Sequence, residues 1–283
     1  MQVSQLWRYP VKSMVGGRVD SIVLDELGVV GDRTWAVRDL ERGGIRGAKK
    51  IGSLMRLAAR DVDDGHVEIT LPDGSTVRTS DADVDERVSA ALDHRVRLEA
   101  LRPADDLDHY RRGGPDSDDV VAELRGIFGR EDDEPLPDFS VFPPIIAEFE
   151  SPPGTYYDVF PLMVMSEAAL AALAAALPDS NVDIRRFRPS FVVDTGDDGA
   201  DASTPGHPEF DWTGRRATIG GATIEFGAPC PRCVMVTREI SADIPADGAV
   251  LRHIVRDLDQ NLGIYATVVT PGVIRAGDAM TFV

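Results

Sequence analysis

Two cysteines, Cys230 and Cys233, are the only thiols in the 283-residue chain, and they lie three positions apart. They belong to the segment Pro229-Cys230-Pro231-Arg232-Cys233, in which prolines constrain the backbone and an arginine separates the thiols. A neighbouring guanidinium favours thiolate over thiol, and a thiolate is a nucleophile or a soft metal ligand. The segment therefore predicts a site of sulfur chemistry, with two inert cysteines in a turn as the alternative.

Other kinds of site fit the sequence less well. A structural zinc site needs four ligands, and none of the five histidines has the spacing that would complete the two cysteines. A thioredoxin-like redox pair should open a helix, whereas we predict strands on both sides of the segment, at residues 222–226 and 234–237. The sequence shows no G-x-S-x-G nucleophile elbow, no P-loop and no strand-linked G-x-G-x-x-G fingerprint.

The composition narrows the class of protein. A net charge of −18 argues against a nucleic-acid partner, because phosphate binding needs surplus Lys and Arg. No apolar run approaches the ~20 residues that cross a bilayer, and the N-terminus lacks the form of a signal peptide. Two cysteines do not suggest a secreted disulfide framework. We therefore expect a cytoplasmic protein without a membrane span, large enough for two subdomains.

The basic residues are unevenly divided between the two types. Only Lys12, Lys49 and Lys50 among the 30 basic residues are lysines, and the rest are arginines. An aspartate-rich, lysine-poor surface keeps a protein soluble when salt screens charge, which suggests a salt-adapted source. A GC-rich genome with acidic loops is the alternative. If the chain is adapted to salt, its unfolding midpoint should rise between low and molar KCl, and the absence of a rise would exclude the idea.

Hydrophobic alternation predicts a β-rich N-terminal part. We expect strands at residues 3–9, 19–24, 34–38, 58–62, 67–71, 75–79 and 96–100, and helices at 49–57 and 83–92. Residues 102–138 are acidic and contain Gly and Pro, with one expected helix at 120–128. This stretch is interpreted as an insert or interdomain connection.

Residues 139–283 combine short strands with a few helices. We expect extended segments at 139–149 and 155–161, strands at 162–166, 191–193, 216–219, 222–226, 263–269 and 272–283, and helices at 167–177 and 249–258. Ser166 should cap the first of these helices, and Gly220-Gly221 should turn a hairpin. The pattern predicts a mainly β fold with some α structure (α+β), in which the C-terminal part has a β-barrel-like core.

Several basic residues fall where predicted strands meet turns. Lys12 and Arg33 lie at such junctions, where backbone amides and basic side chains can converge on an anion, although each could be a solvated side chain. Arg185, Arg186 and Arg188 form either an anion site or a salt-bridge cluster with nearby carboxylates. A thiolate and such basic residues would together suit a cofactor with a phosphate tail and a metal that accepts a cysteine sulfur.

An ordered series of short motifs runs along most of the chain. They are Tyr9-Pro10-Val11-Lys12-Ser13, Gly31-Asp32-Arg33-Thr34-Trp35, Phe187-Arg188-Pro189, Pro229-Cys230-Pro231-Arg232-Cys233 and Asn261-Leu262-Gly263-Ile264-Tyr265-Ala266. On these motifs the sequence resembles the MOSC family (molybdenum cofactor sulfurase C-terminal domain), and within it the amidoxime-reducing components and their bacterial counterparts. The resemblance implies a MOSC N-terminal β-rich domain at 1–101, an acidic insert at 102–138, a β-barrel-like MOSC domain at 139–283, and a cofactor cleft between the two domains.

The resemblance also assigns site residues. Cys233 matches the cysteine that ligates molybdenum, which makes it the implied metal ligand and catalytic residue, whereas the role of Cys230 is left open. The positions implied to hold or line the site of the molybdenum cofactor are Lys12, Ser13, Arg33, Asp158, Arg188, Ser190, Pro231 and Arg232. Relatives commonly have asparagine where this chain has Ser190, so the contact to pterin or substrate is expected to differ there.

By resemblance, the protein is a molybdenum-cofactor oxidoreductase that reduces the N–O bond of small N-hydroxylated compounds. Electrons should come from a separate donor protein, ferredoxin-like or similar, because bacterial relatives with a built-in ferredoxin-like domain need four cysteines beyond these two. The alternative is a carrier that binds molybdenum cofactor, or sulfur as a persulfide, without redox turnover of its own. A cofactor-free MOSC module is the third interpretation.

Overall fold

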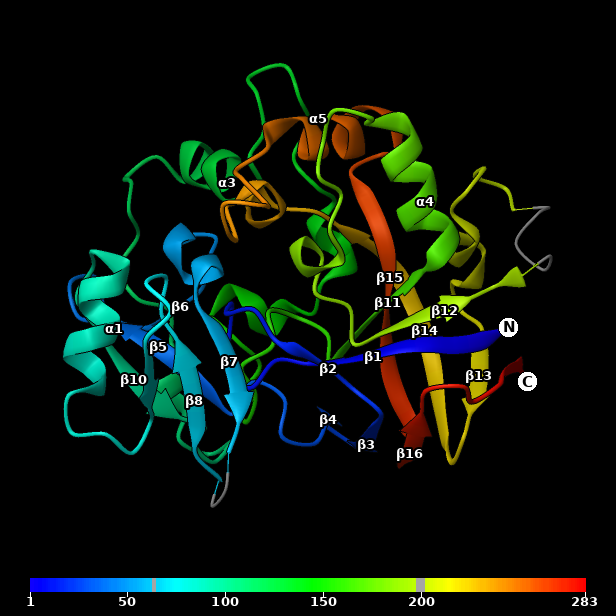
Figure 1. Cartoon of the computed structure of the whole chain (residues 1–283). Helices are drawn as coiled ribbons and strands as arrows, with labels where there is room; N and C mark the ends of the chain where they lie inside the picture. Colours follow the sequence, from blue (N-terminus) through cyan, green and yellow to red (C-terminus); the bar gives the residue numbers. More distant parts are fainter. Residues whose placement is uncertain (63–64, 197–201) are drawn as a thin grey trace.

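The computed structural model describes residues 1–62, 65–196 and 202–283, and its main feature is one large sheet (Figure 1). In this part of the chain, eight strands form the sheet in the order β17 (Met280–Phe282), β13 (Arg216–Ile219), β14 (Ala222–Pro231), β15 (Asn261–Thr270), β11 (Leu162–Ser166), β12 (Phe191–Asp194), β1 (Gln2–Arg8) and β2 (Gly17–Val19). Most neighbours are antiparallel, and β11 and β12 are parallel. The parallel pair needs a crossover, which helix α4 supplies.

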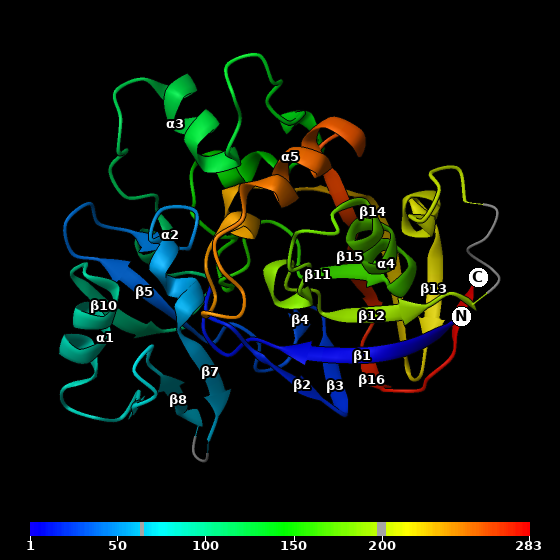
Figure 2. The same ribbon diagram turned by 45° about the horizontal axis from the view of Figure 1, so that its top comes forward.

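Smaller sheets lie beside the main one within the described residues. They are β10 (Val96–Ala100) with β5 (Trp35–Asp39) and β6 (Ile45–Arg46); β16 (Gly272–Arg275) with β3 (Ser21–Asp25) and β4 (Gly28–Val29); and β7 (Ala58–Asp61) with β8 (Val67–Thr70) and β9 (Thr76–Arg78). The β7–β9 meander is the one predicted from the sequence. Figure 2 shows β5, β7, β8 and β10 grouped with helix α1, away from β13 to β15.

Strands from the N-terminal part of the chain pair with strands from the C-terminal part. Leu6 of β1 is paired with Phe191 of β12, and Ile22 of β3 is paired with Ile274 of β16. The first strands in the sequence therefore complete sheets built mainly from the C-terminal part. The boundaries at residues 101 and 138 stay predictions.

The helices are α1 (Val84–Leu92), α2 (Leu107–Tyr110), α3 (Val120–Phe128), α4 (Glu167–Ala176) and α5 (Gly248–Asp257). Side-chain caps begin α3, α4 and α5, whereas α1 and α2 begin without one. The Ser166 hydroxyl accepts a hydrogen bond from the Ala169 amide at 3.0 Å, which confirms the predicted cap of α4. Asp119 caps α3 in the same way, and Gly129 ends it in the left-handed conformation.

Strand β11 shows why the central part of the main sheet is stable. All five of its residues are buried. Leu162 and Val164 pack on one face with Phe191, whereas Met163 and Met165 pack on the other face beneath α4 and α5. Because successive side chains of a strand point to opposite faces, a fully apolar run indicates a strand covered on both sides. The main sheet therefore has two cores, and a separate core fills the N-terminal sheets.

The predicted mainly β fold with some helix is confirmed, but some local predictions are wrong. Residues 234–237, expected as a strand, form the 3₁₀ helix η8 (Val234–Thr237). The buried Arg186 guanidinium donates to the carbonyls of Val236 and Arg238, which fixes this turn from outside the segment. Residues 139–149, expected to be extended, contain the 3₁₀ turns η3 (Phe139–Val141) and η4 (Pro144–Ala147). Residues 49–57, where a short helix was expected, contain the 3₁₀ helix η1 (Gly52–Arg56).

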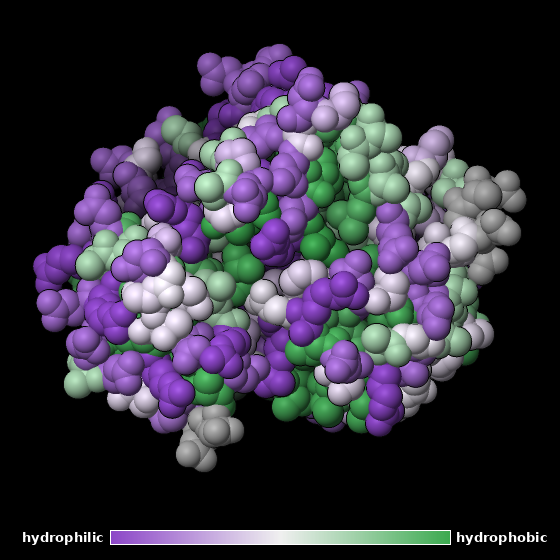
Figure 3. All heavy atoms as spheres, viewed as in Figure 1, coloured by the Kyte–Doolittle hydropathy of each residue, from purple (hydrophilic) through white to green (hydrophobic). Residues whose placement is uncertain are grey.

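Figure 3 shows that hydrophilic residues cover much of one face, as the net charge of −18 leads one to expect. Among the helices of the described residues, none combines the length and the apolar composition needed to cross a membrane.

One buried carboxyl group predicts how stability depends on pH. Glu209 is fully buried, and burial raises its pKa from 4.5 to about 7, opposed by the Ser166 hydroxyl that donates to it at 2.6 Å. The folded state therefore holds a proton that the unfolded chain releases, so stability falls as pH rises from about 4.5 to about 7. Glu209→Gln should remove this loss and gain about 3 kcal/mol over the wild type between pH 4 and pH 8, as measured by urea unfolding. An equal difference at both pH values would contradict the assignment.

Candidate functional site

Strained backbone marks three of the predicted cofactor residues. In the described chain six non-glycine residues have a positive φ, and Ser13 (67°), Arg33 (50°) and Arg188 (58°) are three of them. Such conformations cost free energy in L-residues and persist where the surrounding structure imposes them, often at functional sites. Half of the strained non-glycine residues in the described chain therefore belong to the motifs identified in the sequence.

Asp158 joins two lysines. Its carboxylate lies 2.6 Å from Lys12 Nζ and 2.9 Å from Lys49 Nζ. Lys12 is buried and donates also to the Tyr156 carbonyl at 2.8 Å. Desolvation acts to raise the pKa of Asp158, but the two lysines outweigh it and hold that pKa well below its usual range, while the carboxylate side chain stays 43% exposed. Asp158 is therefore ionised and fixes both ammonium groups.

Two arginines lie against the ring of Tyr9. The guanidinium carbon of Arg188 is 4.2 Å from the ring centre and that of Arg33 is 5.2 Å away. Arg33 is paired with Asp32, whose carboxylate also accepts from the Tyr9 amide. Burial, together with the charge of Arg33, lowers the pKa of Arg188 to about 10.

Arg188 has a donor that nothing in the described structure uses. Its Nη1 donates to the Met14 carbonyl, whereas its Nη2 is buried and has no hydrogen-bond partner among the described residues. A buried unpaired donor on a charged group is costly unless a ligand completes it. Lys12, Arg33, Lys49 and Arg188 with Asp158 are called the basic cluster below, because the charge of Asp158 acts on all four.

The two cysteines differ in environment. Cys230 lies in β14, is buried, and shares a hydrogen bond with the Tyr265 hydroxyl. Burial raises the pKa of the Cys230 thiol. Cys233 is half-buried and directly precedes η8. Both thiols are free. Lys49 lies within electrostatic range of Cys233 and is paired with Asp158 of the basic cluster.

Other predicted residues support the site from within the protein. The Arg232 guanidinium points into the core, where it donates to the carbonyls of Leu262 at 2.8 Å and Phe187 at 3.0 Å. Ser190 is buried, and its hydroxyl accepts from the Met163 amide at 3.3 Å. These side chains hold the strands next to the cysteines, and Pro231 does so through its pairing with β15.

Ser13 holds the segment that carries Lys49. Its hydroxyl accepts a hydrogen bond from the Ala48 amide at 2.9 Å. The hydroxyl lies so close to Gly47 that a Cβ at that position would approach it to 2.8 Å. Ser13 is therefore joined to the basic cluster through the backbone on which Lys49 is placed.

Sequence reasoning missed Lys49 and Arg130. Lys49 carried a signal, since it is one of only three lysines in the chain. Arg130 carried none, because it belongs to the predicted insert. Its buried guanidinium donates to the Arg232 carbonyl at 3.1 Å and to the Gln260 side chain at 2.9 Å. The insert therefore contacts the cysteine segment directly.

Arg130→Gln should loosen this segment and lower the stability of the protein. The change removes donors to two buried acceptors, which costs about 1–3 kcal/mol. The expected result is a lower urea midpoint than that of the wild type. Arg111→Gln, which removes an exposed ion pair with Glu148, is the control and should leave the midpoint unchanged. Equal midpoints in Arg130→Gln and the wild type would contradict the prediction.

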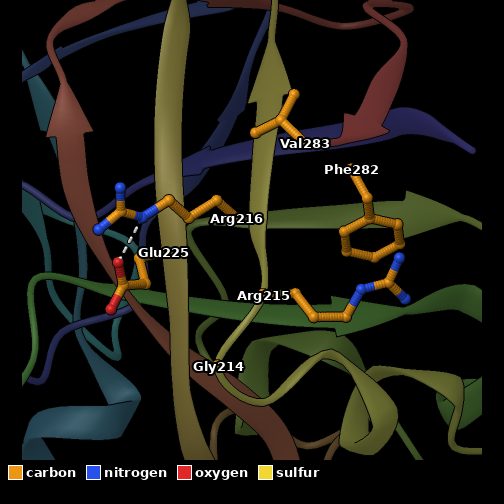
Figure 4. Close-up of a pocket in the computed structure, with 6 residues that line it drawn as sticks. All are labelled: Gly214, Arg215, Arg216, Glu225, Phe282 and Val283. Atoms are coloured by element: carbon orange, nitrogen blue, oxygen red, sulfur yellow. Dashed lines mark hydrogen bonds and ion pairs between the residues drawn. The ribbon is translucent and has the colours of Figure 1, made fainter.

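A large open hollow at the sheet edge is not this site. It has a volume of about 710 Å³ and is lined by Gly214, Arg215, Arg216, Glu225, Phe282 and Val283. Figure 4 shows Arg216 paired with Glu225 and Arg215 beside the Phe282 ring. No residue of the basic cluster and neither cysteine lines it.

Comparison with protein families finds one matching domain in the N-terminal part of the chain and another in the C-terminal part. The MOSC domain matches residues 153–281, and the MOSC N-terminal beta barrel domain matches residues 1–112. The chain is a MOSC protein that contains both domains, which confirms the resemblance found in the motifs.

Among characterised proteins the chain is similar to mitochondrial amidoxime reducing component 2 of Bos taurus, with 27% identity over 254 residues. The match covers 83% of this chain and 66%, just under two thirds, of that protein. Among solved structures it resembles the YUAD protein of Bacillus subtilis, with 12% identity, a TM-score of 0.44, and coverage of 99% of this chain and 93% of that one. YiiM of Geobacillus stearothermophilus is 14% identical with a TM-score of 0.31, covering 44% of this chain and 54% of that one.

Proposed function

We propose that this MOSC protein binds a molybdenum cofactor at the basic cluster, with Cys233 as the protein ligand of the metal. We further propose that it reduces the N–O bond of small N-hydroxylated compounds with electrons from a separate donor protein. The observation that carries the proposal is the buried, unpaired Nη2 of Arg188, next to the strained Arg33 and in a cluster whose Lys49 lies within electrostatic range of Cys233.

The residues present fit a phosphate-bearing pterin. A phosphate with about two negative charges is best held by guanidinium and ammonium groups that donate to its oxygens. Arg188 has a donor to offer, and Arg33 and Lys49 supply further positive charge in a chain whose net charge is −18. Cys233 offers a soft sulfur that is half-buried and borders a positive group.

In this proposal the protein orients the cofactor and neutralises its negative charge. Asp158 keeps Lys12 and Lys49 in fixed positions, and Ser13 holds the backbone next to Lys49. Arg232 and Arg130 fix the carbonyl groups around the cysteine segment, so Cys233 is presented from a rigid support. When bound, the cofactor supplies the two-electron redox chemistry.

A relative supports the finer parts of the proposal. Mitochondrial amidoxime reducing component 2 is named for amidoxime reduction and as a component of a system, which favours both the substrate class and a separate donor. At 27% identity these points come to this chain as proposals. The cytoplasmic location expected from the sequence stays a prediction.

Elemental and pterin analysis of protein made in a cofactor-competent host tests the proposal. About one molybdenum and one pterin per chain are expected, followed by turnover of hydroxylamine or an amidoxime with dithionite-reduced viologen. Bound cofactor without turnover would favour the carrier. The absence of both molybdenum and pterin would contradict cofactor binding altogether.

A further inference from the structure

The turn between α5 and β15 has strained backbone at two neighbouring residues, Asp259 and Gln260. Their φ angles are 46° and 71°, in the left-handed region that residues with a Cβ rarely adopt. Among the six non-glycine residues of positive φ in the described chain, only these two are adjacent. Such backbone costs free energy and persists where surrounding contacts impose it. The contacts of Gln260 therefore show what holds the turn in this form.

The backbone of Gln260 is bonded in two directions. Its amide donates to the Ile254 carbonyl of α5 at 2.9 Å. Its carbonyl accepts from the amide of Arg232, the residue before Cys233, at 2.8 Å. The strained turn is therefore tied to the cysteine segment as well as to α5.

The buried side chain of Gln260 makes a second connection to the same residue. Its Oε1 accepts from the Arg130 guanidinium, from Nε at 3.1 Å and from Nη2 at 2.9 Å. The same Nη2 donates to the Arg232 carbonyl at 3.1 Å. Gln260 thus bonds the N–H of Arg232 directly and orients the group that bonds its C=O. Arg130 and Gln260 are called the clamp below.

The backbone on the other side of Cys233 is also packed. A Cβ at Gly129 would lie 3.3 Å from the Val234 Cβ and 2.7 Å from the Leu251 side chain of α5. Figures 1 and 2 show the end of α3 close to α5, in agreement with this contact. The residues before and after Cys233 are therefore both held, while its sulfur does not cap η8.

We propose that Gln260 is a positioning residue for Cys233. With Arg130 it fixes the peptide group that joins Arg232 to Cys233, and these contacts maintain the strained turn. The inference rests on the proposed function, in which Cys233 must meet a metal that is held in place by the rest of the cofactor. A reactive group of this kind works only when supporting hydrogen bonds fix its position to within a fraction of an ångström.

Three substitutions separate the clamp from the backbone strain. Gln260→Asn suits a positive φ better than glutamine does, but its side chain is one methylene too short for Arg130. Gln260→Glu keeps the length and the acceptor oxygens. Asp259→Asn is the matched control, because Asp259 is strained in the same way but is exposed. If Gln260 served only the shape of the turn, Gln260→Asn should equal the wild type.

Hydrogen exchange on the full-length, cofactor-free chain tests the clamp. In Gln260→Asn the amides of residues 230–234 should exchange about tenfold faster or more, because hydrogen bonds to a charged group are lost. Strand β8, in the N-terminal core, should exchange as in the wild type. Gln260→Glu and Asp259→Asn should stay within about twofold of the wild type.

Three results would overturn the clamp. They are unchanged exchange of residues 230–234 in Gln260→Asn, an equal acceleration in Asp259→Asn, and exchange in Gln260→Glu as fast as in Gln260→Asn. If Gln260→Asn does not fold, Gln260→Met, which keeps the length and removes the carbonyl acceptor, replaces it with the same expectations.

Molybdenum retention then tests the positioning of Cys233. In protein loaded with cofactor, Gln260→Asn should release molybdenum about tenfold faster than the wild type during gel filtration, and Gln260→Glu should retain it. A loosened segment that retains molybdenum like the wild type would make the clamp a structural feature only. A wild type without molybdenum would contradict the proposed function, whereas the exchange rates would still decide whether Gln260 holds the cysteine segment.

Discussion

Cys233→Ser is expected to yield a folded protein that retains no molybdenum and shows only background reduction of N-hydroxylated compounds. A serine hydroxyl stays protonated at neutral pH and is a hard oxygen donor, so it does not replace a thiolate as a soft metal ligand. The fold should tolerate the change, because Cys233 is only half-buried and its sulfur does not cap η8. Metal analysis, viologen-linked turnover and a thermal melt measure the three parts of this expectation.

Cys230→Ser is the matched control for the ligand assignment. Cys230 is buried among apolar residues and shares a hydrogen bond with Tyr265, so its replacement should lower stability. Molybdenum content should be largely kept. If Cys230→Ser loses the metal and Cys233→Ser keeps it, the assignment of the ligand is wrong; loss in both variants would mean that the two thiols act together.

Local patterns were sufficient to predict most regular elements. Strand β10 and helix α3 have the predicted bounds, and Ser166 caps α4 as expected. These elements follow from alternation, periodicity and caps, which are all read within a few residues. Helix η8 could not be predicted in this way, because its apolar, β-branched sequence favours a strand and the arginine that fixes it is about 50 positions away.

The candidate site could be predicted only from motifs. Lys12, Arg33, Arg188 and Cys233 belong to motifs, and the charge of Asp158 acts on the three basic residues among them. Arg130 reaches the cysteine segment across 102 positions of chain, and no local pattern reports such a contact. The sequence also could not predict the direction of the Arg232 side chain, because an arginine between two cysteines could face either the site or the core.

The three arginines at 185–188 show how the structure resolves an ambiguity in the sequence. Arg185 forms a surface ion pair with Asp183 at 2.8 Å. Arg186 is fully buried and donates to backbone carbonyls, including that of Pro245 at 2.7 Å. Arg188 belongs to the basic cluster and has a donor to spare. One arginine is therefore a salt-bridge residue, one holds the fold, and one is available to an anion.

Arg188→Ala should weaken cofactor retention by roughly ten- to 150-fold, the equivalent of 1.5–3 kcal/mol for a lost charge-assisted hydrogen bond. The substitution leaves the backbone strain at this position unchanged, because alanine at a φ of 58° is as strained as arginine. The effect therefore reports the side chain alone. Cofactor content after gel filtration and the release rate into excess competing apoprotein measure it, and Arg185→Ala, which removes only the surface pair, should be neutral.

The same variant should destabilise the cofactor-bound protein more than the cofactor-free protein. Burial lowers the pKa of Arg188 to about 10, so the folded chain without ligand holds this charge at a cost. Its removal relieves that cost but also deletes the hydrogen bond to the Met14 carbonyl and the contact with the Tyr9 ring. The melting temperature should therefore fall further in the cofactor-bound form than in the cofactor-free form. Equal destabilisation of both forms, with cofactor content unchanged, would instead make Arg188 a structural residue like Arg186.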